Sequence, residues 1–210
     1  MARGWDVEGV EVSKVSERIS DFRVYAEEFQ NIPVSVSTYD AVTAWSVLEH
    51  VHNPVAYFRK ASQVLKKDGL FIFLVPNFES TASRHLFAED IPRHLYFYTR
   101  SAVKQYLEKT GFTLLKEENR GNIHKLAPTN WLAHWIQTHI RGKKFTYRDS
   151  PLSSREFRRK HGLNKGISAS LQYAAYSPAS VVGRLLLPVW ETLQVFRKKY
   201  GVSTYVGQKL

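Results

Sequence analysis

Polar side chains follow two apolar segments of the chain, at the points where each segment is expected to end as a strand. The first group lies in residues 45–51, Trp-Ser-Val-Leu-Glu-His-Val, and the second is Asn77, which follows Pro76. Glu and His side chains can move protons or bind metals, and Asn carries both a donor and an acceptor. Ligands of open α/β sheets bind outside the carboxyl ends of the strands, so these residues are the first candidates for a site.

The pair Glu49 and His50 offers the strongest chemistry in the first group. A carboxylate beside an imidazole suits acid–base work or metal binding. One Glu and one His are too few ligands for a metal site, and His52 does not complete one, so we predict no metal here. The plainer alternative is a polar turn whose side chains cap the neighbouring backbone.

A strand, a helix and a second strand are predicted to position these groups. Asp40–Trp45 is a short, mostly apolar run. Asn53 followed by Pro54 is a helix start, because Asn caps free N–H groups and Pro loses nothing at the first helical position. Leu70–Val75 is a continuous apolar strand of the kind that is buried on both faces of a parallel sheet. The crossover between the two strands should be right-handed.

Helical spacing predicts how far the intervening helix runs. Lys66 and Lys67 are expected near its C-terminus, and Gly69 is expected to take a left-handed exit. The apolar positions at helical spacing are Val55, Phe58, Ala61 (or Ser62) and Leu65.

The residues around this unit resemble those of class I S-adenosylmethionine-dependent methyltransferases, in the branch that reads roughly VLEHV…NP…VLK…G…VPN. A second match, Arg93–Thr99 followed by Leu107–Phe112, resembles the later motif of the same branch. The order and spacing agree over about half of the chain. The segments that carry the first match are 40–42, 47–51, 53–54, 64–66, 68–69 and 75–77.

This resemblance implies an α/β fold: a three-layer, Rossmann-like arrangement around a mostly parallel sheet with an antiparallel last strand. The expected strands are Trp5–Val12, Phe22–Tyr25, Phe112–Glu117 and, as an edge strand, Thr204–Gln208. Two helices are expected beside them, Lys14–Ser20 capped by Ser13 and Arg100–Lys109 capped by Thr99 and ended by Gly111.

The resemblance also implies S-adenosyl-L-methionine as the cofactor. Glu11 would receive the two ribose hydroxyls, since a carboxylate accepts two O–H groups at once. The alternative for Glu11 is an acid that stabilises a helix start. Glu27 and Glu28 would lie beside the adenine, although a solvated acidic pair is an equal alternative. The remaining residues expected to line the cofactor are Trp45, Ser46, Glu49 and His50.

The same resemblance places a second group over the methyl acceptor. Asn77, Arg93, His94 and Tyr96 are the expected substrate-binding residues. His94 is the candidate base for an acceptor that must lose a proton. An ordinary structural histidine is the alternative at this position.

The chain departs from the family pattern at its start. A first strand with a glycine-rich turn, which cradles the methionine part of the cofactor, would precede Trp5–Val12, and the printed sequence does not contain it. We expect an N-terminally truncated methyltransferase core. A degenerate, non-catalytic methyltransferase-like binding module is the alternative.

The net charge of +11 comes entirely from the last part of the chain. Residues 1–120 hold 15 Lys/Arg and 16 Asp/Glu, whereas residues 121–210 hold 15 and 3. Apolar stripes lie among these charges at Trp131–Ile140 and Val181–Phe196, with a cationic cluster at Arg155–Lys160. Three alternatives are open for this region. In order of preference, they are a helical lid over the site, a lid that also touches an anionic membrane surface, and a surface for nucleic acid.

The predicted organisation is therefore a core at 1–120, a basic, aromatic helical insertion at 121–200 and a last core strand at 201–210. The expected function is methylation of a small molecule, with an amphipathic or lipid-linked acceptor suggested by the insertion. The chain has no cysteine, which excludes disulfides and thiolate chemistry. It shows no signal peptide and no transmembrane run, so a cytoplasmic location is expected, with membrane-surface contact through 121–200 left open.

Overall fold

The computed structural model describes residues 4–13, 22–80, 93–119, 132, 135–140 and 154–210. These residues fall into two compact units. The first is formed by Met1–Phe73, Ser101–Glu117 and Tyr205–Leu210, and the second by Leu74–Arg100 and Glu118–Thr204. The predicted helix Lys14–Ser20 lies outside the described residues.

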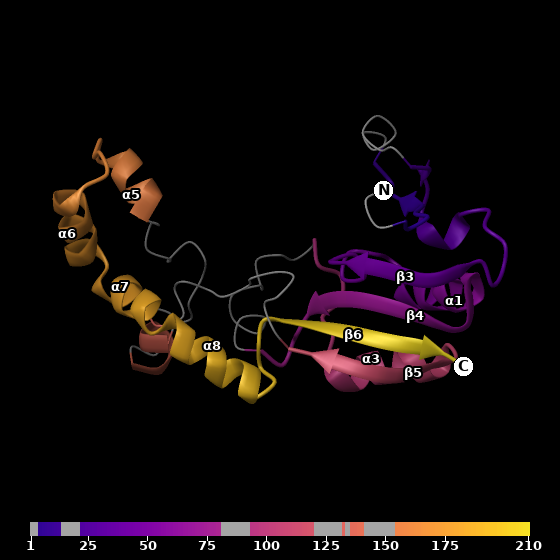
Figure 1. Ribbon diagram of the computed structural model, residues 1–210. Helices are drawn as coiled ribbons and strands as arrows, with labels where there is room; N and C mark the ends of the chain where they lie inside the picture. Colours follow the sequence, from indigo (N-terminus) through magenta and orange to yellow (C-terminus); the bar gives the residue numbers. More distant parts are fainter. Residues whose placement is uncertain (1–3, 14–21, 81–92, 120–131, 133–134, 141–153) are drawn as a thin grey trace. The chain divides into compact units, whose positions relative to one another are not determined.

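Two sheets make up the framework of the described chain, and most of their residues belong to the first unit (Figure 1). The smaller one pairs β1 (Gly9–Val10) with β2 (Val24–Tyr25) in parallel, and both strands are shorter than the sequence predicted. The larger has the order β3-β4-β6-β5, formed by β3 (Tyr39–Trp45), β4 (Leu65–Pro76), β6 (Val202–Lys209) and β5 (Phe112–Glu118).

The helix α1 (Pro54–Val64) begins as predicted. Asn53 is its cap, with Oδ1 accepting from the backbone N–H of Ala56 at 3.2 Å. Its end was predicted wrongly, because Lys66 and Lys67 already belong to β4. The left-handed residue is Asp68, with φ of 62°, and Gly69 does not have a positive φ. Position 69 instead requires glycine for steric reasons, since a Cβ there would lie 2.8 Å from the carbonyl oxygen of Lys66.

An aromatic core joins α1 and α3 (Arg100–Lys109) to β4. Phe58 of α1 is fully buried, and its ring lies 5.3 Å from that of Phe71 and 5.2 Å from that of Phe73. Tyr106 of α3 stacks on the same Phe58 ring at 5.2 Å. Both helices therefore pack on one face of the larger sheet. Gly111, with φ of 83°, follows α3 as predicted.

The last strand is not an edge strand, which corrects the sequence-based expectation. β6 lies between β4 and β5, and β5 forms the edge. Lys209 near the end of β6 donates from Nζ to the carbonyl oxygen of Leu65 at the start of β4. β6 therefore runs opposite to β4, as the arrows in Figure 1 also show.

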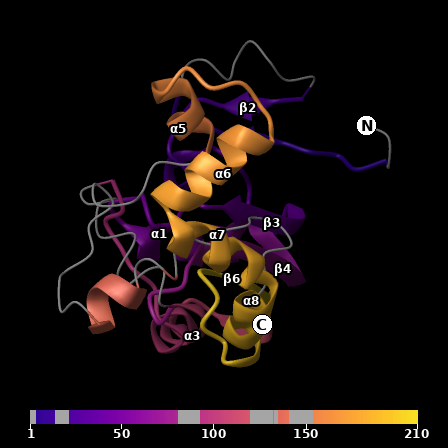
Figure 2. The ribbon, with the colours of Figure 1, turned by 90° about the vertical axis from the view of Figure 1, so that its left-hand side faces the viewer.

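Helices dominate the second unit. The π-helical turn η4 (Ile136–Ile140) occupies part of the predicted Trp131–Ile140 stripe, and Trp131 lies outside the described residues. α5 (Ser154–Lys160), α6 (Ile167–Tyr176), α7 (Pro178–Leu185) and α8 (Leu187–Phe196) follow, each in contact with its neighbour along the chain. In both views α6, α7 and α8 form a row and do not fold back into a bundle (Figures 1 and 2). None of the described helices is long and apolar enough to cross a membrane.

Candidate cofactor and acceptor sites

The turn after β3 is the most constrained part of the candidate site in the first unit. Ser46 has φ of 54°, a left-handed conformation that is uncommon for a residue other than glycine. Leu48 and Glu49 follow it and are both fully buried. Strained backbone and a buried acid at a strand's carboxyl end are features that cluster at ligand sites.

Glu49 is the buried carboxylate of this turn. Its Oε2 atom has no hydrogen-bond partner among the described residues. Burial raises the pKa of Glu49 to about 6, although hydrogen bonding to backbone and the neighbouring His50 oppose this shift. The Nε2 atom of His50 lies 3.9 Å from Oε1 of Glu49. The carboxyl group therefore titrates near pH 6, and one of its two buried oxygens accepts no hydrogen bond from the described residues.

Glu11 follows β1, where the sequence placed the ribose-binding acid. Its side chain is exposed, and Oε1 accepts a hydrogen bond from the backbone N–H of Ser13 at 3.0 Å. The backbone N–H of Glu11 donates to the carbonyl oxygen of Tyr25 at 3.0 Å and continues the β1–β2 pairing. The carboxylate therefore stays open to further donors.

The acidic pair after β2 divides into two environments. Glu27 is exposed, whereas Glu28 is half-buried and accepts a 2.6 Å hydrogen bond from the side-chain amide of Gln30. The pKa of Tyr57 is raised, chiefly by burial and also by the charge of Glu28. Tyr57 also packs its ring against Phe29 at 5.8 Å, so an aromatic surface lies next to Glu28.

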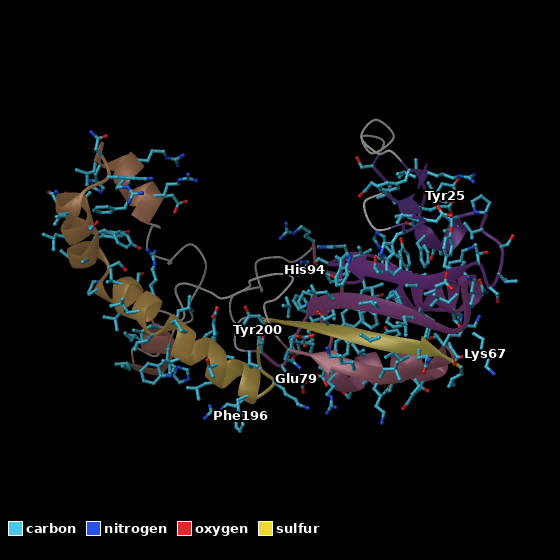
Figure 3. All side chains as sticks on the ribbon, viewed as in Figure 1. Tyr25, Lys67, Glu79, His94, Phe196 and Tyr200 are labelled. Atoms are coloured by element: carbon cyan, nitrogen blue, oxygen red, sulfur yellow. The ribbon has the colours of Figure 1, made fainter. Side chains whose placement is uncertain are left out.

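A tyrosine–glutamate cluster that the sequence did not single out joins the two sheets of the first unit. Oε2 of Glu8 accepts hydrogen bonds from the hydroxyls of Tyr25, at 3.2 Å, and Tyr39. Burial and this bond raise the pKa of Tyr39. The guanidinium of Arg23 lies 4.6 Å from the centre of the Tyr25 ring. Tyr25 lies at the end of β2 (Figure 3), so the cluster ties this strand to the start of β3.

In the second unit Asn77 forms a buried hydrogen-bonded node. Its Nδ2 donates to the carbonyl oxygens of Lys198 and Tyr200, both at 3.1 Å, and more weakly to Oδ1 of Asn119 at 3.4 Å. Its Oδ1 accepts from the backbone N–H of Glu79 at 3.0 Å. The amide is thus engaged within the protein. Its predicted contact with an acceptor stays a prediction.

The predicted acceptor group at 93–96 lies in an aromatic segment of the same unit. His94 is half-buried, with its ring 6.0 Å from that of Phe97 (Figure 3). Tyr96 packs near Tyr98 at 6.4 Å, and Arg93 is exposed. The backbone of this segment is held beside Asn77, because Tyr98 bridges to it and accepts from the N–H of Phe78 at 2.9 Å.

Comparison with known proteins assigns the chain to a protein family. The family described as a methyltransferase domain matches residues 1–117, more than half of the chain. The chain belongs to this family. The match spans every candidate residue named above for cofactor and acceptor, whereas the branch within the family stays a prediction. No curated protein matches this methyltransferase chain.

Solved structures confirm the predicted methyltransferase-like α/β fold. A methyltransferase in complex with the Trm112 activator of Haloferax volcanii is 12% identical, with a TM-score of 0.55 over 96% of this chain and 71% of that one. A methyltransferase from Thermotoga maritima is 14% identical, with a TM-score of 0.52 over 97% and 72%.

A third similar structure is the geranyl diphosphate C-methyltransferase of Streptomyces coelicolor A3(2), with S-adenosyl-L-homocysteine bound. It is 11% identical, with a TM-score of 0.50 over 99% of this chain and 63% of that one. Likenesses at such low identity establish the fold and leave the acceptor of this chain undefined.

Proposed function

We propose that this chain binds S-adenosyl-L-methionine and transfers its methyl group to a small-molecule acceptor. The observation that carries the proposal is the family match over residues 1–117, which covers the strand ends of the first unit and the buried Glu49. The bound cofactor would supply a methyl group made electrophilic by its positively charged sulfur.

The acidic residues of the first unit fit such a cofactor. It presents hydroxyl and ammonium donors, and the buried Oε2 of Glu49 is an acceptor with no protein partner among the described residues. Glu11 is proposed to accept the ribose hydroxyls, and its exposed carboxylate supports this role. Glu27 and Glu28 are proposed for the adenine side. Trp45, Ser46 and His50 complete the proposed lining.

The protein's contribution to the transfer step is mainly positional. Methyl transfer by in-line displacement gains most of its rate from holding donor and acceptor aligned at near-attack distance. A base is required only where the acceptor atom must lose a proton, and His94 is the proposed base in that case. Arg93 and Tyr96 are proposed to orient the acceptor.

A transfer assay tests this function directly. The full chain would be incubated with S-adenosylmethionine labelled in its methyl group, together with cellular small-molecule and lipid extracts. We expect time-dependent label in the extract fraction, at least about tenfold less with Glu11→Ala because a charged hydrogen bond to the cofactor is lost. Glu108→Ala, which removes an exposed acid paired with Lys104 on α3, is the matched control and should leave transfer unchanged.

The alternative is a non-catalytic, methyltransferase-like binding module. It predicts that the folded chain binds S-adenosylhomocysteine or another ligand, yet no extract gains label. A chain that transfers label in the assay excludes this alternative.

A further inference from the structure

Helices α7 and α8 present a row of large apolar side chains to solvent. We call these residues the apolar ridge. Leu185 is 75% exposed, Val189 60% and Phe196 86%. In Figure 3 the Phe196 side chain lies at the C-terminal end of α8. The complete ridge is Val182, Leu185, Leu186, Val189, Leu193 and Phe196.

The ridge is a single stripe, because α7 and α8 continue each other with little interruption. The backbone N–H of Leu186 donates to the carbonyl of Val182, and that of Trp190 donates to the carbonyl of Leu186, both at 3.0 Å. Helical rotation of about 100° per residue then places all six ridge side chains within an arc of about 100°. An arc of this width is that of an amphipathic helix face.

The opposite side of the two helices buries small and polar residues. Ser180 and Gly183 of α7 and Gln194 of α8 are buried, while the ridge residues are exposed. Val195 packs against the small core of Leu74 and Tyr200. This arrangement reverses the usual amphipathic pattern, in which leucine and phenylalanine face the core. The described residues therefore leave this apolar face uncovered.

Positive charge accompanies the ridge. Arg197, Lys198 and Lys199 follow Phe196 directly at the C-terminal end of α8, and all three are exposed. Between residues 177 and 200 the sequence has one acid, Glu191. An exposed apolar stripe flanked by cations matches the two requirements of binding to an anionic lipid surface, which are apolar area and attraction to headgroups.

We propose that the apolar ridge docks the protein onto an anionic membrane surface, with α7 and α8 lying in the plane of the interface. The ridge side chains enter the boundary between headgroups and acyl chains, and the flanking cations contact lipid phosphates. A second copy of the chain fits this face less well, since two ridges brought together would also bring together two sets of like charges. Docking does not depend on the cofactor, so a failure of the docking test and a failure of the methyl-transfer test can be distinguished.

Vesicle co-sedimentation of the full chain tests the proposal. Wild type is expected to sediment with vesicles of phosphatidylglycerol and phosphatidylcholine, and much less with phosphatidylcholine alone. The variant Leu185→Ser/Phe196→Ser should bind the mixed vesicles at least about tenfold more weakly, because two exposed apolar side chains lose their burial in lipid. Circular dichroism checks that it remains folded, which is expected because both side chains are exposed.

The matched control changes two apolar residues outside the ridge that are also well exposed. Ile167 and Leu171 of α6 are 82% and 65% exposed, and Ile167→Ser/Leu171→Ser should retain wild-type binding. Arg197→Gln/Lys199→Gln should weaken binding at low salt by about fivefold or more for each charge removed, and high salt should weaken the wild type similarly.

Two results would overturn the proposal. One is equal sedimentation of the wild type and the ridge variant. The other is a wild-type protein that binds neither kind of vesicle and elutes from a size-exclusion column as a dimer, while the ridge variant elutes as a monomer. The ridge would then be a surface for a second copy of the chain.

Discussion

Replacing Asn77 by Asp should destabilise the fold far more than the change of one side-chain atom suggests. In the native node the NH₂ group faces three oxygens, the carbonyls of Lys198 and Tyr200 and Oδ1 of Asn119. Asp at this position turns a donor into a second acceptor, so oxygen would face oxygen at 3.1–3.4 Å in a site that is 4% exposed.

The magnitude follows from the bonds that are lost. Two good hydrogen bonds and one weak one disappear, each worth about 1 kcal/mol net, and the carboxylate is left unpaired and buried. Together these effects predict a loss of about 3–5 kcal/mol in the free energy of unfolding near pH 7.5. The bond that Oδ1 accepts from the N–H of Glu79 can persist.

The loss should depend on pH. A carboxyl group among acceptors has a folded-state pKa above its unfolded value of about 3.9, because only the protonated form can donate. The deficit relative to wild type is therefore small below about pH 4 and grows as the pH rises toward the folded-state pKa.

Urea unfolding followed by tryptophan fluorescence, at pH 7.5 and near pH 4, measures both the size and the pH dependence. Asn164→Asp is the control, since Asn164 is exposed in the same unit and should change stability by less than about 0.5 kcal/mol. A variant Asn77→Asp within this margin at pH 7.5, or with the same deficit at both pH values, would refute the proposed node.

Three further substitutions test the first unit. Glu49→Gln should stabilise the protein near pH 7.5 by about 2 kcal/mol, because burial raises the Glu49 pKa from 4.5 to about 6 and makes the ionised form costly. Paired urea titrations of the two proteins should show this stability difference shrinking as the pH falls from about 6 to 4.5. Phe58→Ala should lose about 3–5 kcal/mol in urea unfolding, and a loss below 1 kcal/mol would contradict its place in the aromatic core. Gly207→Ala should lower the melting temperature, since the new Cβ would lie 2.7 Å from Cδ2 of buried Leu107 in α3. An unchanged melting temperature would contradict this close packing of α3 on β6.

Local signals explain which parts of the fold could be predicted from the sequence. Asn53-Pro54 specified the start of α1 through capping chemistry that needs no distant partner. The bounds of α3 were also correct, because Gly111 provides the left-handed exit within the same segment. The motif spacing identified the methyltransferase family, which the family match confirms.

Long-range pairing explains the errors. The sequence could not show that residues 65–67 leave the helix, because their strand is held by Lys209, which lies far along the chain. The same pairing places β6 inside the sheet instead of at its edge.

The candidate site shows the same division between local and distant information. Spacing singled out Glu49 and Asn77 as polar residues at strand ends. Burial of Glu49 and the 121-residue separation between Asn77 and its partner Lys198 appear only once the chain is folded. Glu8 carried no sequence signal at all, since its role depends on hydroxyls from Tyr25 and Tyr39.

Calorimetric titration of the 210-residue chain with S-adenosylhomocysteine tests most directly whether this methyltransferase-family chain binds the cofactor. We predict binding at micromolar affinity, weakened at least about tenfold by Glu11→Ala and unaffected by Glu108→Ala. A well-folded wild-type sample that gives no binding heat, and no protection from thermal unfolding by the same ligand, would contradict the proposed cofactor site.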